Sequence, residues 1–256
     1  MEVNLQAITA MRAVTVSREY GSGGGEIAAR LARKLGWQLI DHAVIEQAAS
    51  ELGVYETEVA KHDEEYVEST LSRILNRIQN FVTSIPASAP ASGFALPLPA
   101  AETPAYQDTI RQIIIAGANT GHVVIVGRGG QVLLADHRDV LHIRVVAPLE
   151  PRVAYVARRE GLDMDAARTR VQAKDRARER YMQTQYHCHH EDPHLYDLVI
   201  DTAVLDLDRS VDLICLALEF KASRLSVPVE ELGPAAGLAP YAGQPADFRV
   251  LGQSSG

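Results

Sequence analysis

A glycine-rich loop near the start of the chain carries the residue types that point most directly to chemistry. From Ser17 to Glu26 the sequence reads SREYGSGGGE, between an apolar, β-branched run at 13–16 and apolar residues that recur at helical spacing until Gly36. This order predicts a strand, a loop and a helix start. Backbone N–H groups and the positive end of a helix dipole then converge on one anion. The pattern predicts a phosphate cradle formed by Gly21, Ser22, Gly23, Gly24 and Gly25.

The loop departs from the common phosphate-loop signature G-x-x-x-x-G-K-[ST] at two places. Gly24 stands where the lysine that reaches the terminal phosphates would be. Gly25 and Glu26 follow it, so the serine or threonine hydroxyl that would hold Mg²⁺ is missing as well. Arg18 stands near the first glycine position of the signature, before the glycines. This position alone suggests that Arg18 replaces the lysine as a catalytic cation.

Two other interpretations of the loop are weaker. A dinucleotide-binding loop needs G-x-G-x-x-G, but Glu26 occupies the position of the last glycine, and Asp41 is only a weak candidate for the acidic ribose partner. A plain turn without a ligand would not need four glycines within five residues, because each glycine costs conformational entropy on folding. A mononucleotide phosphate site is therefore favoured.

Asp41 ends a predicted strand, Trp37–Asp41, at the edge where ligands of open α/β sheets bind. Its carboxylate could orient a phosphoryl acceptor or hold a metal-bound water. It could equally cap the helix that starts at His42, because aspartate is favoured at that position. Position alone does not separate these two roles.

A second glycine-rich turn, Gly127-Arg128-Gly129-Gly130-Gln131, follows the predicted strand 122–127. Glycines let a backbone come close to a ligand, and the guanidinium of Arg128 offers a bidentate fork for phosphate. The alternative is a surface turn with a solvated arginine. Placement at the same sheet edge as the first loop favours the ligand interpretation.

The polar stretch 163–194 is predicted to be largely helical and rich in bases, with Arg176 and Arg180 four residues apart. Such bases can stabilise the charge that spreads over a transferring phosphoryl group. Asp175 and Glu179 interleave with them, however, and a solvated, salt-bridged helix face is the commoner outcome of this pattern. The histidine-rich run 187–190 is predicted to be a polar loop rather than a metal site, because sequence neighbours cannot easily all point at one ion.

Short apolar runs that alternate with helical patterns predict an α/β doubly wound domain. The predicted strands are Ala13–Ser17, Trp37–Asp41, His122–Gly127, Val140–Val146 and Asp197–Asp201. The predicted helices are Gly25–Leu35, His42–Leu52, about 56–82, Tyr106–Ala116, Pro148–Glu160 and Leu207–Phe220. A Pro-, Ala- and Ser-rich stretch at 84–104 is predicted to be flexible, and 226–256 is predicted to be a disordered tail after a domain at 1–225.

Composition narrows the class of protein. A chain of 256 residues with 46% hydrophobic and 23% charged residues is typical of a globular protein with one sizeable domain. The formal net charge of −8 argues against broad binding to nucleic acid or membrane surfaces. Two distant cysteines, Cys188 and Cys215, and no apolar run of membrane-spanning length predict a cytoplasmic location. A homo-oligomer is compatible with the sequence.

Together these pieces resemble the cytidylate kinase-like branch of the nucleoside monophosphate kinases. The resemblance covers about residues 13–220 and rests on the loop 17–24, Asp41, the turn 127–130, and the run 175–180 before the strand region 197–202. It implies a P-loop NTPase fold with a five-stranded parallel sheet flanked by helices, a helical lid at about 158–194 and an inserted helical segment at about 56–104. It also implies ATP and Mg²⁺ as cofactors.

Carried over onto this sequence, the resemblance implies that the glycine loop holds the donor phosphates. Asp41 is implied to lie near the acceptor, and Arg128 to bind the acceptor's phosphate. Arg176 and Arg180 are implied to be lid arginines that neutralise transition-state charge. The first functional hypothesis is a kinase that transfers the ATP γ-phosphoryl group to a nucleoside monophosphate or another small acceptor. The alternative is an ATP-binding sensor or scaffold whose degenerate loop has lost catalysis.

Overall fold

One parallel sheet forms the centre of the molecule. The structure is a computed structural model that describes residue 4, residues 6–45, residue 48 and residues 104–233. Its strands are β1 (Ala13–Arg18), β2 (Gln38–Ile40), β3 (Val123–Val126), β4 (Val140–Val146) and β5 (Leu198–Asp201). All neighbours pair in parallel, in the order β2-β3-β1-β4-β5. The predicted five-stranded parallel sheet is confirmed.

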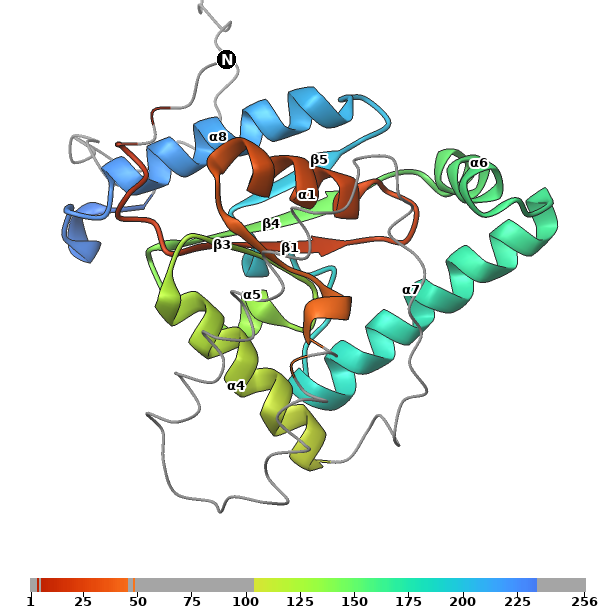
Figure 1. The fold of residues 1–256 in the computed structure, drawn as a ribbon, viewed down its shortest axis with the longest axis horizontal. Helices are drawn as coiled ribbons and strands as arrows, with labels where there is room; N and C mark the ends of the chain where they lie inside the picture. Colours follow the sequence, from red (N-terminus) through yellow and green to blue (C-terminus); the bar gives the residue numbers. More distant parts are fainter. Residues whose placement is uncertain (1–3, 5, 46–47, 49–103, 234–256) are drawn as a thin grey trace, which may run out of the picture.

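Helices cover both faces of the sheet (Figure 1). On one face lie α1 (Gly24–Leu35) and α8 (Leu207–Ser223), and on the other lie α4 (Pro104–Thr120) and the short α5 (Gly130–Leu133). Beyond the carboxyl ends of the strands, α6 (Leu149–Glu160) leads into α7 (Met164–Tyr186). Two short 3-10 helices follow, at Pro193–Leu195 and Val229–Glu231.

Alternating side chains of the central strands enter two separate cores. Val14 and Val16 of β1 pack in the core beneath α1 and α8, whereas Ala13 belongs to the core beneath α4. Strand β3 divides in the same way, with Val124 in the first core and Ile125 in the second. Burial on both faces explains why the strands read as nearly continuous apolar runs in the sequence.

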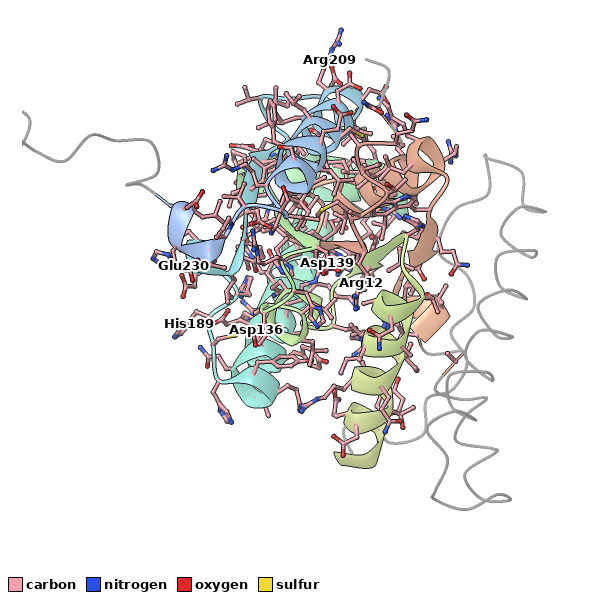
Figure 2. All side chains as sticks on the ribbon, turned by 90° about the vertical axis from the view of Figure 1, so that its left-hand side faces the viewer. Arg12, Asp136, Asp139, His189, Arg209 and Glu230 are labelled. Carbon is pink, nitrogen blue, oxygen red and sulfur yellow. The ribbon has the colours of Figure 1, made fainter. Side chains whose placement is uncertain are left out.

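Arg12 anchors the amino edge of the sheet. Its guanidinium contacts the Asp139 carboxylate at 3.0 Å and donates to Asn119 at the end of α4. Figure 2 shows Arg12 beside Asp139, which lies just before β4. These polar contacts hold the starts of β1 and β4 in register. The relative position of the carboxyl ends of the two strands is thereby fixed as well.

Several predictions fall partly or wholly outside the described residues. Residues 42–45 of the predicted helix His42–Leu52 are helical, whereas most of the inserted segment at 56–104 is not described. In the predicted tail, residues 226–233 are described and Arg138 donates to the Val227 carbonyl oxygen at 2.8 Å. The domain boundaries remain predictions. Within the described ranges, no helix is long and apolar enough to cross a membrane.

The packing of α1 against the sheet gives a stability prediction. Leu31 is fully buried, and truncation to alanine would leave a cavity, so we expect Leu31→Ala to lower the free energy of unfolding by about 2–5 kcal/mol. Arg33→Ala, on the exposed side of the same helix, is the matched control and should change it by less than about 0.5 kcal/mol. Urea unfolding followed by circular dichroism measures both. Equal effects of the two substitutions would contradict the assigned inner face of α1.

Candidate active site

The carboxyl ends of β1, β2 and β3 bring Arg18, Asp41 and Arg128 together. The guanidinium of Arg18 lies against Gly127, directly after β3. Arg18 is close enough to Asp41 and Arg128 for both to influence its charge. Three residues that are far apart in the sequence and were predicted as a set therefore meet at one edge of the sheet.

Arg18 sits in an environment that disfavours its own charge. Removal from water, the nearby Arg178 and, to a lesser extent, Arg128 lower the pKa of Arg18 to about 9, while Asp41 acts in the opposite direction. A guanidinium normally stays protonated far above this range. Burial is the largest cause of the low pKa of Arg18, and the neighbouring arginines add to it. An anionic ligand beside the guanidinium would favour its charged form.

Asp41 caps the helix that follows it. Its Oδ1 accepts the backbone N–H of Val44 at 3.1 Å, so the capping interpretation is confirmed. Its charge also acts on Arg18, which places the carboxylate beside the glycine loop. The two roles considered from the sequence are compatible, because a carboxylate has several acceptor positions.

Arg128 is held by its neighbours rather than extended into solvent. Its Nη2 lies 2.6 Å from His42 Nδ1, its guanidinium lies 5.7 Å from the centre of the Tyr181 ring, and its carbonyl oxygen accepts from the Tyr186 hydroxyl at 2.9 Å. Its φ of 57° is uncommon for a residue other than glycine. Several contacts thus fix a strained residue at the end of a strand, a situation that recurs at binding sites.

His42 was not singled out from the sequence. Loss of water contact and the charges of Arg128, Arg18, Lys174 and Arg178 lower the pKa of His42 to about 4. The imidazole is therefore neutral near pH 7, and one ring nitrogen can accept a hydrogen bond from Arg128. A polar residue one position after a strand-end aspartate was the only sequence signal available for it.

The glycine loop packs tightly on its surroundings. Gly21 and Gly23 have φ values of 83° and 79°, in the left-handed region that favours glycine. A Cβ on Gly21 would lie 2.9 Å from Val156 of α6, and one on Gly23 would lie 2.8 Å from Leu207 of α8. Gly23 is the N-cap of α1, and no side chain of the described residues caps this helix. Its first N–H groups therefore remain available at the end of β1, as the predicted cradle requires.

Ser22 contributes its backbone to the loop rather than its side chain. Its hydroxyl lies within hydrogen-bond distance of the carbonyl oxygens of Glu19 and Val145, at 3.0 and 3.1 Å, and the residue is buried. Its own carbonyl oxygen accepts from the Thr202 hydroxyl at 2.8 Å. These bonds fix the loop to the sheet and to the segment after β5.

Arg152 of α6 was missed in the sequence and proves to be the main anchor of the loop. Its guanidinium is buried and donates to the carbonyl oxygens of Ala147 and Tyr20, at 2.9 and 3.1 Å. It also bonds to Asp175 of α7 at 2.5 Å and lies 3.5 Å from the Glu19 carboxylate. One side chain thus ties together the loop, the end of β4 and α7. Nothing in its sequence context distinguishes it from the other arginines of α6.

The inner face of α7 carries Asp175 and Arg178. Asp175 accepts the backbone N–H of Tyr20 at 2.8 Å, while Arg178 donates to the carbonyl oxygen of Arg18 and lies over the Tyr20 ring. A spacing of three residues places both on one side of a helix. Helix α7 therefore meets the loop directly.

Arg176 and Arg180 point away from this contact. Each is two positions from Arg178, about half a turn around the helix, and both are exposed. No hydrogen bond or ion pair joins the side chain of either to another residue in the described part of the chain. The structure thus brings Arg178 to the loop in the arrangement seen here, and the catalytic roles predicted for Arg176 and Arg180 remain predictions.

The comparisons with known proteins agree with this geometry. A model of the Cytidylate kinase-like family matches residues 13–204, three quarters of the chain. The chain belongs to the cytidylate kinase-like family. The match includes the glycine loop, the strand-end residues and the whole of α7.

Two cytidylate kinases illustrate the relationship. The one from Methanopyrus kandleri is 32% identical over 110 residues, which are 40% of this chain and 57% of that protein. The one from Pyrobaculum aerophilum is 26% identical over 220 residues, which are 84% of this chain and 98% of that protein. The first three curated relatives are matched over only 22% to 61% of their own length. Family membership is thus established, whereas activity and substrate are matters of proposal.

A solved structure supports the fold. An uncharacterized protein from Eubacterium ventriosum superposes with a TM-score of 0.53 at 18% identity, covering 81% of this chain and 98% of that one. At this level of identity the likeness concerns the fold alone.

In this member of the cytidylate kinase-like family, Glu26 is engaged away from the cradle. Its carboxylate accepts from the Tyr155 hydroxyl at 2.7 Å and pairs with Arg159 at 2.9 Å, both on α6. Glu26 was the residue that broke the dinucleotide fingerprint. Its contacts show that it joins α1 to α6, which is a structural reason for an acidic residue at this position.

The histidine-rich segment after α7 contacts the last turns of that helix. His189 and His190 both contact the Glu179 carboxylate through Nδ1. No group of three or more potential ligands suited to a metal occurs among the residues that the structure describes. The buried Arg144 donates to the carbonyl oxygen of His190 at 2.7 Å, so these contacts tie the end of α7 to β4.

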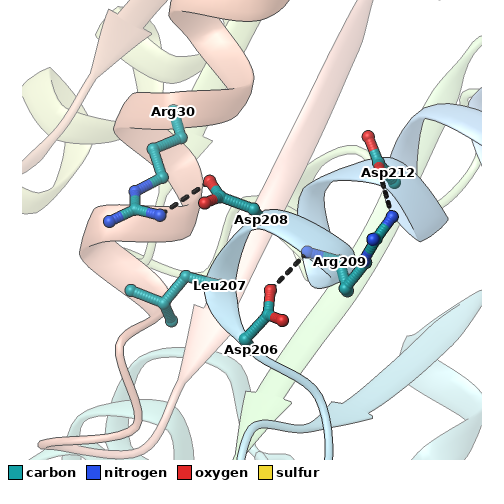
Figure 3. Close-up of a pocket in the computed structure, with 6 residues that line it drawn as sticks. All are labelled: Arg30, Asp206, Leu207, Asp208, Arg209 and Asp212. Atoms are coloured by element: carbon teal, nitrogen blue, oxygen red, sulfur yellow. Dashed lines mark hydrogen bonds and ion pairs between the residues drawn. The ribbon is translucent and has the colours of Figure 1, made fainter. Parts of the chain in front are cut away.

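An open depression of about 440 Å³ lies between α1 and α8 (Figure 3). Its charged residues pair with one another: Arg30 contacts Asp208 at 2.7 Å, and Arg209 contacts Asp212 at 3.6 Å. Leu207 lines the depression and packs against Gly23 of the loop. The depression therefore borders the glycine loop, but the ion pairs of Arg30 and Arg209 serve the contacts within and between the two helices.

The charge of the site can be measured through His42. We expect its imidazole to titrate by NMR near pH 4, because protonation would place a charge on a group shielded from water and beside Arg128 and Arg18. The folded pKa lies below the ordinary value, so the contribution of His42 to stability is lost as the pH falls from about 6.5 to about 4. Arg128→Gln removes one of these charges and should raise the pKa.

Arg33→Gln, on the exposed side of α1, is the control and should leave the titration of His42 unchanged. A midpoint near 6.5 in the unmodified protein, or no response to Arg128→Gln, would contradict the concentration of positive charge at this edge.

Proposed function

We propose that this chain is a phosphotransferase that binds ATP at the glycine loop and transfers the γ-phosphoryl group to a nucleoside monophosphate or another small anionic acceptor. The observation that carries the proposal is the placement of Arg18, Arg128 and Arg178 at the carboxyl edge of the sheet. Arg18 lies against Gly127, next to Arg128, and Arg178 donates to the carbonyl oxygen of Arg18. This cluster forms within a chain whose formal net charge is −8. Asp41 and Asp175 balance part of this positive charge, and an anionic ligand would balance more of it.

Phosphoryl transfer needs fixed positive charge and N–H donors, and the carboxyl edge of the sheet offers both. The reaction depends on positioning and on neutralising charge at the transferred group more than on covalent chemistry by the protein. Preformed N–H groups at the start of α1 would bind the donor phosphates, and fixed guanidinium groups would stabilise the charge that develops in the transition state. An oxygen of the acceptor attacks the γ-phosphorus, the bond to the bridging oxygen breaks, and ADP leaves.

Each predicted site residue has a place in this proposal. Arg18 supplies positive charge to the donor phosphates, and Asp41 orients the acceptor. Arg128, held by His42 and Tyr181, binds the acceptor's anionic group. Arg176 and Arg180 would serve as lid arginines only if α7 rearranged around the bound nucleotide.

Mg²⁺ fits this site in part. Asp41 would provide one carboxylate ligand, which suits a cation that prefers oxygen and usually keeps several waters and phosphate oxygens. The loop itself would add little, because Gly25 has no side chain and the Ser22 hydroxyl is engaged with backbone carbonyl groups. When bound, the ion would neutralise phosphate charge.

A second function is favoured by the same loop. The lysine and the magnesium-holding hydroxyl of the common signature are both replaced by glycine. An ATP-binding sensor or scaffold without turnover would show this combination. Tight ATP binding by a protein that releases no ADP with any acceptor would favour it over the kinase.

A coupled assay of ADP release tests the kinase proposal. We expect ATP- and Mg²⁺-dependent turnover with at least one nucleoside monophosphate, and CMP and dCMP are the first to try. Arg128→Ala should lower kcat/KM for the acceptor by roughly 100-fold, because a charged contact to the acceptor is lost. Arg33→Ala, remote from the edge, should retain full activity.

The contrary results are clear. Absence of turnover across all acceptors by folded protein that binds ATP would replace the kinase by the sensor. If saturating ATP and ADP both fail to raise the Tm, neither function stands, because a ligand that binds the native state must stabilise it.

A further inference from the structure

The loop lacks its lysine at a position where the structure leaves no room for a side chain. A Cβ placed on Gly24 would lie 2.6 Å from the Cβ of Arg18 and 3.2 Å from its Cγ. It would also lie 3.3 Å from the Cβ of Val145 in the buried strand β4. These atoms belong to the rigid base of Arg18 and to a core residue, so neither can move away cheaply.

The neighbouring glycine provides the contrast. A Cβ on Gly25 would meet no atom within 4 Å. Gly24 and Gly25 both lie in the first turn of α1, and neither is among the residues with a positive φ. No local steric requirement therefore makes position 25 a glycine. Position 24 must be glycine as long as the Cβ and Cγ of Arg18 lie where they do.

The guanidinium of Arg18 occupies the space in front of the loop. Its stem passes over Gly24 and its Nη1 reaches Gly127 at the end of β3. Its backbone is fixed by β1, and its carbonyl oxygen accepts from Arg178 at 3.3 Å. The side chain is therefore placed between the two glycine-rich turns, where its position is set by strand pairing rather than by a flexible loop.

We infer that Arg18 and Gly24 form a reciprocal exchange, in which Arg18 supplies from the start of the loop the phosphate-binding cation that lysine would supply at position 24. The phosphate role rests on the proposed function, whereas the steric half of the exchange does not. An arginine with this course excludes a lysine at position 24, and a lysine there would require the stem of Arg18 to be absent. Arginine at position 18 and glycine at position 24 are then linked changes: the first supplies the cation, and the second makes room for it.

The exchange changes the chemistry of the cation. A guanidinium offers several donors in a planar fork, while an ammonium group is a compact point charge. Arg18 can therefore bond to two phosphate oxygens at once, and its pKa of about 9 still leaves it protonated at neutral pH.

A set of stability measurements tests the steric half without any ligand. Gly24→Ala should lower the Tm by about 5 °C, as expected for overpacking in a domain of this size, although alanine is the better helix former. Gly25→Ala, its matched control, should leave the Tm unchanged or raise it slightly. In the Arg18→Ala background, which keeps the Cβ that clashes, Gly24→Ala should still lower the Tm. In the Arg18→Gly background, which lacks that Cβ, Gly24→Ala should leave the Tm unchanged.

Isothermal titration with ATP and Mg²⁺ tests the phosphate half. Arg18→Gln keeps the stem but removes the charge, so we expect the Kd for ATP to rise about 10- to 100-fold. Arg18→Gly should raise the Kd for ATP at least as much. The double variant Arg18→Gly/Gly24→Lys restores a cation in the vacated space and should recover at least about tenfold in affinity relative to Arg18→Gly. Arg33→Ala is the binding control.

The outcomes separate the two proposals. If the unmodified protein binds ATP and Arg18→Gln binds it equally well, the exchange is overturned and the proposed function survives. If the unmodified protein binds no nucleotide, the proposed function fails together with the phosphate contact of Arg18. If Gly24→Ala is as stable as Gly25→Ala, the steric half of the exchange is overturned.

Discussion

Arg152 is the point on which the geometry of this site depends. Its guanidinium is buried, and its polar contacts reach three parts of the chain: Glu19 and Tyr20 in the loop, Ala147 after β4 and Asp175 in α7. Removing one partner of a buried charge leaves the other uncompensated, which is far more costly than losing a surface ion pair. The loop and α7 are thus bound to a common anchor, and the glycine cradle keeps its shape through contacts outside its own sequence.

A second constraint is the positive charge gathered in front of that anchor. Arg18 and Arg128 end up near one another because β1 and β3 are adjacent parallel strands whose carboxyl ends coincide. Burial and, after it, the like charges nearby lower the pKa values of both Arg18 and His42. Proteins retain such unfavourable arrangements where function requires them, and a polyphosphate is the ligand class that compensates the charge directly.

Much of the fold could be predicted from residue patterns. The strands, α1, α6 and α8 came from apolar runs and helical periodicity, because burial on two faces or on one stripe leaves a local signature. The choice of Arg176 and Arg180 as lid residues came from a resemblance, and the sequence could not tell which side of α7 meets the loop. Asp175 and Arg178 were visible as charged residues, but their partner Tyr20 lies in a distant part of the chain.

The sequence by itself determined that strand, glycine loop and helix follow one another, and that lysine is missing from position 24. These facts are local, since periodicity and glycine content act through neighbouring residues. Only the tertiary structure decided why the lysine is missing. The stem of Arg18 fills the space above Gly24, and strand pairing carries its guanidinium to Gly127. Which side chains share a volume depends on contacts between segments that lie far apart in the chain, and no local pattern records them.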